Sequence, residues 1–486
     1  MRKLLLFLSL TTLSLSLTIA QQPWQMAHGG GQRRGYANIT GPQTSHIKWK
    51  YNMGYSPGEG ENSVAINNTG IVYVGGHNSI YAFNRSGAFK WSQAYPGMQG
   101  PCVSKDGLHV YFVADSAIVC LDTNGVKQWA YIMGDKGIFG PTLSADGNYL
   151  FQGCWDHNVY AITSTGTLKW KYATHGCVSY NMALTPGGSL VVGGGDAHCG
   201  TDTLMYCIGN TETSSPITLW TYQGPFSHWS GPAIGRNGLI YIPMSPRLYL
   251  FDTLGNFKWS IGGPANVAGV ITPGLYGDTT AASTTIYTGD FQGRFFSISA
   301  ATQDTTWAYQ TGKDPITKNA GIPCFPVVDK KGDVYFGAAD YNVYALNKSG
   351  TKLWSYATGG EITEASPAID PETGTLYVTS GDGYVYAFQD SSSTTSVNNV
   401  ESANIELQVS PNPANNKFTL TADYIMQNGT QILLYTITGQ LVINKQLDRP
   451  AQSVEVNTGN LINGIYMLRL QLPDGSIANK KIEIIK

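Results

Sequence analysis

Eight tryptophans recur at a nearly constant interval through the first three quarters of the chain. Their mean spacing is about 44 residues, the length of one four-stranded blade of a β-propeller, and they are Trp49, Trp91, Trp129, Trp170, Trp220, Trp259, Trp307 and Trp354. The sequence around them also repeats, because Asn342–Leu346 is a near copy of Asn158–Ile162. We interpret each tryptophan as a packing residue between repeats rather than as part of a cofactor site.

Each repeat has the pattern of short strands joined by tight turns. In the seventh repeat, apolar residues alternate in 326–328, 333–337, 343–346 and 352–356, with Lys-Lys-Gly and Asn-Lys-Ser-Gly turns between strands. Alternation with period two, bounded by turn residues, predicts antiparallel hairpins. No stretch of this region shows a sustained helical period, so we expect it to be nearly free of helix.

The two ends of the repeat region complement each other. Eight units of three strands follow one another, but the first tryptophan strand, 47–51, precedes all of them, and the last unit, 367–388, has no tryptophan strand after it. We therefore predict an all-β, eight-bladed propeller with four-stranded blades over residues 21–390. Its last blade is closed by the N-terminal strand, which removes the unpaired edges of an open sheet.

Composition agrees with a folded, turn-rich β protein. Charged residues make up 13% of the chain and aromatic residues 12%, and 57 of the 486 residues are glycine, so a disordered chain is excluded. The 30 Lys and Arg residues against 32 Asp and Glu residues give no basic field for a phosphate backbone. We expect no nucleic-acid partner.

Residues 1–20 have the pattern of a cleaved secretory signal peptide. Arg2 and Lys3 precede an apolar run that extends to about Leu17, and small residues end at Ala20. A retained interfacial anchor is the alternative. No later stretch reaches 18 apolar residues, so we predict no transmembrane span.

The composition changes after the last repeat. Residues 391–403 are rich in Ser, Thr and Asn and contain no aromatic residue, which is typical of a flexible linker. Residues 404–486 hold six or seven alternating segments, and a chain of about 80 residues with this pattern predicts a small C-terminal β-sandwich.

The repeat region resembles the pyrroloquinoline quinone (PQQ)-like β-propeller repeat family over residues 23–389. The resemblance rests on Pro23–Met26, on Gly41–Gln43 before the first strand, and on recurring Pro-Ala-Ile, Gly-x-x-Tyr, Asp-x-x-x-Tyr-Ala and Gly-x-x-x-Trp elements. The family contains quinoprotein dehydrogenases, an outer-membrane assembly scaffold and secreted proteins without known activity. The resemblance therefore implies a fold and leaves the function open.

The tail resembles the type A C-terminal sorting domain of type IX secretion. The matching residues are Pro411, Asn412, Pro413, Gly439, Gly464, Tyr466, Lys480 and Lys481. This resemblance implies that the type IX machinery is a partner, and that the protein passes through the periplasm of a Gram-negative bacterium to be secreted or held at the cell surface. An immunoglobulin-like accessory module or a carbohydrate-binding module is the alternative for this tail.

Motifs for hydrolytic and metal chemistry are weak. Gly54–Gly58 fits G-x-S-x-G and His28–Gly31 imitates a lipase oxyanion motif, but a nucleophile elbow needs a strand-to-helix turn that this pattern lacks. The sequence contains no metal-binding motif with persuasive ligand spacing. We predict no catalytic residue and no metal site.

The family resemblance raises the question of PQQ. Its dehydrogenases hold a calcium-bound quinone over the propeller axis with a Glu, an Asn and Asp residues, and usually have a disulfide between adjacent cysteines. Glu361, Glu364, Asn319 and Asp314 lie in loops before the last two blades, but they match no family motif, and no two cysteines are adjacent. We therefore predict no cofactor and keep PQQ with calcium as the alternative.

The seven cysteines divide by their place in the repeat. Four take small-residue core positions, and they are Cys102, Cys120, Cys154 and Cys207. The other three, Cys177, Cys199 and Cys324, fall in predicted loops. Because seven is odd, at least one thiol stays unpaired within the chain. Cys177 with Cys199 is the candidate disulfide.

One group of loop residues is a candidate ligand patch. Four histidines and two tryptophans in blades three to five should share one end of the propeller, and they are Trp155, His157, His175, His198, His228 and Trp229. Imidazoles can donate and accept hydrogen bonds, and indoles can stack on sugar rings. The alternative is that exposed loops simply collect such residues. A ring of aspartates, Asp115, Asp156, Asp202, Asp340 and Asp382, is interpreted as turn chemistry rather than a cation site.

These patterns favour an exported, non-catalytic propeller that binds a glycan, peptide or protein at the cell surface. Two alternatives remain open. One is a PQQ- and calcium-dependent quinoprotein dehydrogenase, and the other is a scaffold of cell-envelope assembly.

Overall fold

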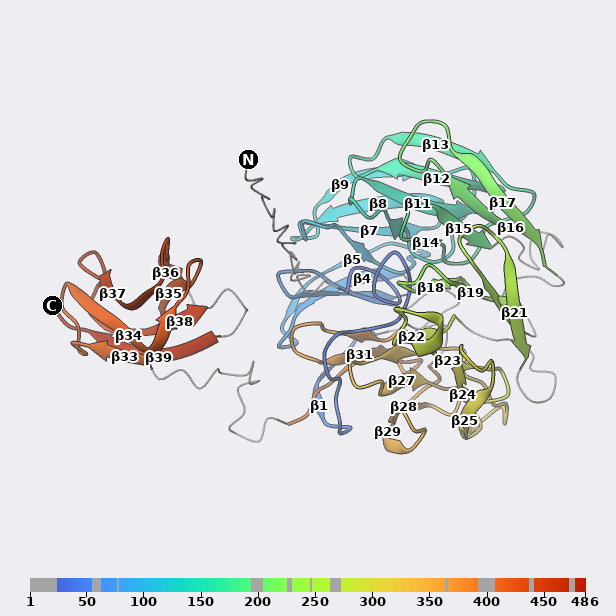
Figure 1. Cartoon of the computed structure of the whole chain (residues 1–486). Helices are drawn as coiled ribbons and strands as arrows, with labels where there is room; N and C mark the ends of the chain where they lie inside the picture. Colours follow the sequence, from blue (N-terminus) through green and yellow to red (C-terminus); the bar gives the residue numbers. More distant parts are fainter. Residues whose placement is uncertain are drawn as a thin grey trace, which may run out of the picture. The chain divides into compact units, whose positions relative to one another are not determined.

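The computed structural model describes the chain from residue 24 to its end, apart from several gaps. The described ranges are 24–54, 63–76, 78–193, 204–224, 230–244, 247–262, 272–362, 366–391, 407–436, 441–471 and 477–486. The chain forms two compact units, Met1–Ser391 and Ser392–Lys486 (Figure 1). Within the described ranges the only helical element is a 3₁₀ turn, η1 (Ala281–Ser283), and no helix is long and apolar enough to span a membrane.

The described strands of the first unit make eight four-stranded antiparallel sheets, numbered here in chain order. Sheet 1 contains β2 (Val64–Ile66), β3 (Ile71–Gly76), β4 (Ser79–Asn84) and β5 (Phe89–Ala94). Sheet 2 contains β6 (Cys102–Val103), β7 (His109–Ala114), β8 (Ala117–Asp122) and β9 (Lys127–Ile132). Sheet 3 contains β10 (Thr142–Leu143), β11 (Tyr149–Cys154), β12 (Asn158–Thr163) and β13 (Leu168–Ala173). Sheet 4 contains β14 (Ala183–Leu184), β15 (Leu190–Gly193), β16 (Leu204–Gly209) and β17 (Ile217–Gln223).

The remaining sheets follow the same order, with the innermost strand first. Sheet 5 contains β18 (Ala233–Ile234), β19 (Ile240–Met244), β20 (Arg247–Phe251) and β21 (Phe257–Gly262). Sheet 6 contains β22 (Gly274–Tyr276), β23 (Thr285–Gly289), β24 (Arg294–Ser299) and β25 (Thr305–Gln310). Sheet 7 contains β26 (Val327–Val328), β27 (Val334–Gly337), β28 (Asn342–Leu346) and β29 (Lys352–Ala357). Sheet 8 contains β30 (Ala368–Ile369), β31 (Leu376–Thr379), β32 (Tyr384–Phe388) and β1 (Ile47–Asn52).

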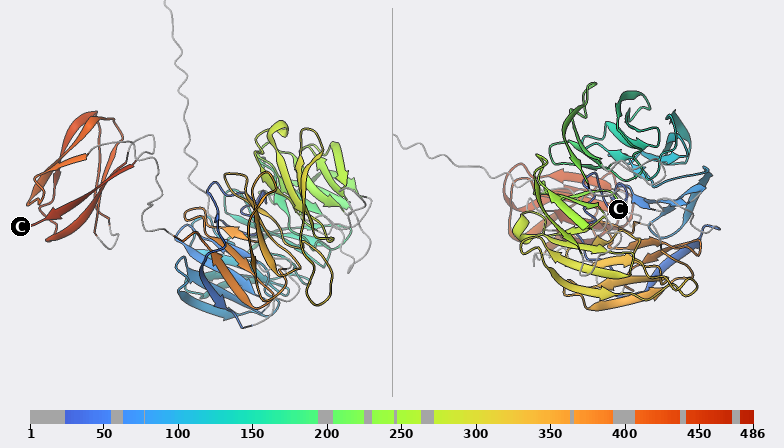
Figure 2. Two further views of the ribbon diagram at one scale, coloured as in Figure 1. Left: turned by 90° about the horizontal axis from the view of Figure 1, so that it is seen from below. Right: turned by 90° about the vertical axis from the view of Figure 1, so that its right-hand side faces the viewer.

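The sheets form a propeller that is closed by the N-terminal strand. They follow one another in chain order around a central axis (Figure 2, right). Strand β1 pairs antiparallel with β32, with Lys50 opposite Tyr386 and Asn52 opposite Tyr384. This pairing confirms the predicted closure of the last sheet, and it leaves β32 without an open edge.

The core of the propeller lies between neighbouring sheets. In the layer between sheets 3 and 4, for example, Phe151 and Trp170 pack with Leu184 and Ile208, all of them buried. The innermost strands are only two or three residues long and are buried, for example β6, β10 and β14. Each sheet therefore depends on packing against its two neighbours.

The repeated tryptophans join each sheet to the next one. The Nε1–H group of Trp129 on sheet 2 donates to the carbonyl oxygen of Ser164, in the β12–β13 turn of sheet 3, at 3.1 Å. The same donation is made by Trp49, Trp91, Trp170, Trp220 and Trp307, with distances from 2.8 to 3.3 Å. Trp259 packs on the hydrophobic cluster shared by sheets 5 and 6. In this structure the tryptophans therefore lie at contacts between neighbouring sheets.

The last tryptophan has a different acceptor because sheet 8 is completed from the N-terminus. Trp354 on sheet 7 donates to the carbonyl oxygen of Pro42, at 2.8 Å, five residues before β1 begins. The residue that fills the acceptor position for the eighth sheet therefore comes from the opposite end of the propeller sequence.

The second unit is a small sandwich of two sheets. One contains β33 (Leu407–Ser410), β34 (Lys417–Met426) and β37 (Ala451–Asn457), and the other contains β36 (Leu441–Gln446), β35 (Gln431–Thr436), β38 (Gly464–Gln471) and β39 (Ile477–Ile484). Phe418 and Leu420 pack with Leu434 and Leu468 in its own core.

Replacing Gly166 tests the contact between tryptophan and turn. Gly166 has φ +87°, and a Cβ atom there would lie 2.6 Å from the Trp129 ring. We expect Gly166→Ala to lower the free energy of unfolding by about 3 kcal/mol, from backbone strain plus overpacking. Gly188→Ala is the matched control, because Gly188 has φ +80° with nothing within 4 Å, and it should cost only about 1 kcal/mol. Denaturant unfolding of both variants measures the difference; equal losses would contradict the packing role.

Candidate functional site

The axis of the propeller is occupied by residues 24–35, which we name the axial segment. Its carbonyl oxygens accept hydrogen bonds from the backbone N–H groups of the innermost strands, in the order of the sheets. The pairs are Trp24 with Ile66, Gln25 with Val103, Gly31 with Leu184, Gln32 with Ile234, Arg34 with Leu275 and Gly35 with Val328, at 2.6 to 2.8 Å. The segment thus runs around the axis and satisfies inner edges that would otherwise lack partners.

Arg33 and His28 extend these contacts to the other sheets. The buried guanidinium group of Arg33 donates to the carbonyl oxygens of Met182 and Ala27 and to the Oγ1 atom of Thr142 on sheet 3, at 2.9 to 3.1 Å. The backbone N–H of His28 donates to Ser366, in the loop before sheet 8. Through these bonds the axial segment contacts each of the eight sheets or the loop that leads into it.

The ring of His28 is enclosed between two carbonyl groups. Its Nδ1 atom lies 2.9 Å from the Arg33 oxygen, and its Nε2 atom lies 2.7 Å from the Pro326 oxygen. Burial lowers the pKa of His28 to about 4, although both carbonyl groups favour the charged form. His28 is therefore neutral at pH 7, and it fixes the axial segment to the loop before sheet 7.

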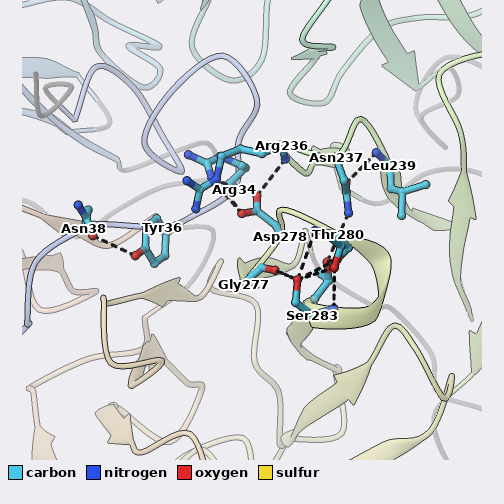
Figure 3. A network of polar contacts seen from close by, with 11 residues as sticks. Arg34, Tyr36, Asn38, Arg236, Asn237, Leu239, Gly277, Asp278, Thr280 and Ser283 are labelled. Atoms are coloured by element: carbon cyan, nitrogen blue, oxygen red, sulfur yellow. Dashed lines mark hydrogen bonds and ion pairs between the residues drawn. The ribbon is translucent and has the colours of Figure 1, made fainter. Parts of the chain in front are cut away.

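A carboxylate between two guanidinium groups anchors the end of the axial segment (Figure 3). Asp278 is buried, and its Oδ2 atom lies 3.0 Å from Arg34 Nη1 while its Oδ1 atom lies 3.0 Å from Arg236 Nε. The guanidinium carbons of Arg34 and Arg236 also lie 5.8 and 5.7 Å from the ring centre of Tyr36, within cation–π range. The two guanidinium groups compensate the charge of the buried carboxylate. Because Arg236 lies in the β18–β19 turn of sheet 5 and Asp278 in the β22–β23 loop of sheet 6, these ion pairs link both sheets to Arg34 of the axial segment.

From this anchor the chain runs along sheet 7 to the rim. The N–H of Ala37 donates to the carbonyl oxygen of Val328, and the N–H of Lys330 donates to that of Ile39. The N–H of Gly41 donates to the Asp329 carboxylate at 2.9 Å. One continuous stretch therefore links the axis to β1 at the outer edge of sheet 8.

Aromatic rings fill the axis at the end of the propeller that carries the longer loops. Phe139 precedes sheet 3 and Phe325 precedes sheet 7, and their ring centres are 6.4 Å apart. In a ring of eight sheets these two are opposite each other, so the contact lies on the axis. Tyr180 packs on Phe139 at 5.6 Å, and His28 packs on Phe325 at 5.8 Å. We name this end the loop end and these four rings the axial aromatic cluster.

Among the described residues, the loop end shows no ligand set for a quinone with calcium. A flat ring inserted into the axis at this end would meet the axial aromatic cluster. Asp314 is held in its own loop by the N–H groups of Thr317 and Ile316, which lower its pKa, while burial and then the charge of Asp314 raise the pKa of Glu361. Glu364 lies outside the described residues. Nowhere in the described ranges are three His, Cys, Asp or Glu side chains placed to hold a metal ion.

Three members of the predicted ligand patch lie in two adjoining loops. Trp155 Nε1 donates to Ser179 Oγ at 2.9 Å, and the carbonyl oxygen of His157 accepts from the N–H of Thr174. His175 is exposed, and its Nδ1 atom lies 2.9 Å from the Tyr206 hydroxyl. The other three members, His198, His228 and Trp229, lie outside the described residues. The role of the patch in ligand binding stays a prediction.

The recurring aspartates join loops to strands, and Asp340 and Asp382 also accept from the N–H two residues later, as the turn interpretation predicts. Asp340 accepts from the Tyr344 hydroxyl at 2.5 Å and from the Gly312 N–H at 2.8 Å. Asp382 makes the same pair of bonds with Tyr386 and with Gly359. Asp156 accepts from Tyr160 and Lys171. Asp115 instead is exposed and lies 3.8 Å from Lys136, and Asp202 is outside the described residues.

The cysteines are mostly buried thiols. Free cysteines among the described residues are Cys102, Cys120, Cys154, Cys207 and Cys324, all buried. Burial raises the pKa of Cys120, Cys154, Cys207 and Cys324 to about 12, so these thiols are inert at neutral pH. Cys177 is disulfide-bonded, as predicted. Its predicted partner Cys199 lies outside the described residues, so the pairing stays a prediction.

The His28–Gly31 motif, which the sequence analysis rejected as an oxyanion hole, has a structural role in the axial segment. His28–Gly31, which imitates an oxyanion motif, lies inside the propeller and packs against its inner strands. Most of the G-x-S-x-G stretch, residues 55–58, lies outside the described residues. The sequence signals at the axial segment were Pro23–Met26, which contributes to the family resemblance, and the His28–Gly31 run, and neither indicated a position on the axis.

The residues of the sorting pattern lie in the second unit. Asn412 accepts from the N–H of Glu483 on β39 at 2.9 Å, so the Pro-Asn-Pro element is fastened to the last strand. Tyr466 is buried and donates to the Ile462 carbonyl oxygen. Lys480 and Lys481 are both exposed residues of β39. Gly439 lies outside the described residues.

Family models match almost the whole chain beyond residue 23. A model described as outer membrane protein assembly factor BamB matches residues 24–260 and 247–409. The chain belongs to this family of PQQ-like repeat propellers. A second model, the secretion system C-terminal sorting domain, matches residues 408–486. Both resemblances are confirmed, and a sorting domain of this kind indicates secretion or a cell-surface location.

Solved structures share the propeller fold at low sequence identity. BamB from Moraxella catarrhalis is 17% identical, with a TM-score of 0.54, and the match covers 71% of this chain and 99% of that one. The quinohemoprotein alcohol dehydrogenase ADHIIG from Pseudomonas putida HK5 is 13% identical, with a TM-score of 0.56 over 76% of this chain and 80% of that one. A europium-containing methanol dehydrogenase is 12% identical, with a TM-score of 0.56 over 74% and 89%. No curated protein matches the sequence.

The buried His28 predicts how stability depends on pH. Its pKa is about 4 in the folded protein and about 6.5 in the unfolded chain, so the unfolded chain binds the proton first as the pH falls. The free energy of unfolding should therefore decrease between pH 6.5 and pH 4, by roughly 3 kcal/mol in total. Denaturant unfolding across this range should show the decrease in the native protein but not in His28→Gln.

The exposed His46 provides the control for this measurement. His46→Gln should retain the full pH dependence of the native protein, because it changes an exposed side chain and leaves the buried His28 in place. Parallel curves for the native protein and His28→Gln would show that the axial histidine is not the group responsible.

Proposed function

We propose that this protein is a secreted, non-catalytic propeller, delivered to the cell surface by its sorting domain, where it binds a glycan, peptide or protein. The observation that carries the proposal is the axial aromatic cluster. Phe139 and Phe325 meet on the axis at the loop end, and the family resemblance implies that a quinone would lie over the axis. Since the chain fills its own axis, its outer surfaces are the places left for a partner.

The loop junction between sheets 3 and 4 is one such surface. Trp155 is partly exposed and held in orientation by Ser179, and the exposed rings of His157 and His175 come from the two joined loops. An oriented indole beside imidazole groups offers an apolar face together with hydrogen-bond donors and acceptors. This combination suits a sugar, a peptide or a polar protein surface.

The sorting domain supports export as the fate of the propeller. It has a hydrophobic core of its own, built from residues such as Phe418, Leu434 and Leu468, and it matches a sorting-domain model over its full described length. A separable unit of this kind suits a sorting role and leaves ligand binding to the propeller. We also propose residues 1–20 as the signal peptide that brings the chain to the periplasm.

Two other functions have less support. The solved alcohol and methanol dehydrogenases share the propeller fold, but a quinone at the axis conflicts with the axial aromatic cluster. An assembly scaffold, as in the family description, would act in the cell envelope, and a sorting domain would carry such a scaffold away from it.

Removal of the tail tests the sorting role. Without residues 403–486 we expect a folded propeller that accumulates in the periplasm, because the two units have separate cores. Cell fractionation with immunodetection measures location, and protease resistance measures folding. The control is Lys445→Ala, an exposed change on β36 that should leave export intact. Surface delivery of the tailless protein would refute the assignment.

A calorimetric titration with PQQ and calcium tests the non-catalytic role. We expect no saturable heat, because the axial aromatic cluster occupies the position of the ring. The positive control is a PQQ-dependent alcohol dehydrogenase depleted of its cofactor, titrated under the same conditions. Saturable micromolar binding to the native protein would place it among the dehydrogenases instead.

A further inference from the structure

A groove of about 670 Å³ lies between sheets 2 and 3 at the end of the propeller opposite the loop end. We name this the turn end, because the β6–β7, β10–β11 and β12–β13 turns form the groove walls. The side chains used below are Asp106, His109, Gln128, Trp129, Asp146 and Asn148, all of which line the groove. None of them belongs to the loop patch or to the axial segment.

Aromatic rings form one side of the groove, and their positions are fixed. The Trp129 indole is only partly buried, and its Nε1–H bond to Ser164 fixes the ring plane. The ring centre of Tyr111 lies 5.8 Å from Trp129, and His109 stacks on Tyr111 at 6.4 Å with an interplanar angle of 19°. The three rings therefore form a row that needs no reordering on binding, which lowers the entropic cost.

Two carboxylate groups stand on the opposite walls. Burial opposes ionisation of Asp106, but hydrogen bonds from Ser104 and Leu108 outweigh it and keep its pKa below the usual value. In Asp146 the bonds from Ser144 and Asn148 have the same effect. Both groups are thus charged acceptors at neutral pH, and charge-assisted hydrogen bonds from hydroxyl groups are the strong ones.

Trp129 and Tyr111 belong to the repeat, but the polar side chains beside them depart from it. The strand position of His109 is taken by Ile71 in sheet 1, Leu239 in sheet 5 and Thr285 in sheet 6, each opposite the same inner-strand register. The turn Ser-x-Asp-Gly occurs at 104–107 and 144–147, the two walls of this groove, and at no other inner turn of the described propeller. Residues that the fold needs recur in every sheet, whereas these do not.

We propose that this groove binds a pyranose unit of a neutral glycan, an inference that rests on the proposed binding function and names its ligand class. A pyranose ring has an apolar C–H face, which suits the Trp129 ring, and an edge of hydroxyl groups, which suits Asp106 and Asp146. Asn148 Nδ2 already donates to Asp146 at 2.6 Å and Gln128 Nε2 to the Val126 carbonyl oxygen at 3.1 Å, so these side chains offer their amide oxygens as acceptors. The groove is too polar and too open for a purely apolar ligand.

The experiment compares binding of the full-length protein to immobilised oligomers of glucose, mannose and N-acetylglucosamine. We expect binding to at least one of these glycans, and at least a tenfold weaker affinity for the double variant Asp106→Asn, His109→Ala. Trp129 is left unchanged because its indole also joins sheets 2 and 3. Lys90→Ala is the matched control, since Lys90 precedes Trp91 on sheet 1 as Gln128 precedes Trp129 on sheet 2, and it should bind like the native protein.

A third variant, Trp155→Ala, separates failure of the groove from failure of the binding function. If Trp155→Ala abolishes glycan binding and the groove variant does not, the groove proposal is wrong while the binding function stands at the loop end. If the native protein binds none of the three glycans, the groove proposal is overturned. The thermal midpoint of each variant should equal that of the native protein, which shows that the variant is folded. If the double variant Asp106→Asn, His109→Ala does not fold, Asp146→Asn is tested in its place.

Discussion

The pairing of β1 with β32 determines the rest of this structure. It joins residues about 340 positions apart in sequence, as the bond between His28 and Ser366 also does, with a separation of 338. Loop closure over such a distance costs free energy, but the cost grows only slowly with loop length. In return every sheet gains two neighbours, and the core, which lies between sheets, becomes continuous around the ring.

The same N-terminal stretch also occupies the axis. Its backbone satisfies the inner edges of six sheets, while Arg33 reaches sheets 3 and 4 and His28 the loops before sheets 7 and 8. Residues 36–42 then connect the axis to the rim. One continuous stretch of chain therefore bonds to the innermost strands and also supplies the outermost strand of sheet 8. The fold shared with the dehydrogenases at 12 to 13% identity therefore carries, in this chain, an axis lined by its own N-terminal segment.

Repetition separates residues that serve the fold from residues available for function. The tryptophan-to-turn bonds and the Asp-to-Tyr bonds recur from sheet to sheet, so their presence in any one sheet needs no functional explanation. His109 and Trp155 do not recur, although they lie on the same scaffold. In a repeat protein such departures are the strongest guide to a binding surface, because selection for stability alone would favour the recurring residue.

The sequence by itself determined the repeat, the alternating strands and the closure by an N-terminal strand. These features depend on local periodicity and spacing, which are read directly from the chain. The sorting domain was predicted from its resemblance to a known family. Only the tertiary structure decided what lies on the axis. Residues 24–35 have no periodicity, and their partners are backbone groups of strands up to about 300 residues away, which any sequence could supply. The contact between Phe139 and Phe325 is likewise invisible locally, because it exists only when two opposite sheets of a closed ring face each other across the axis.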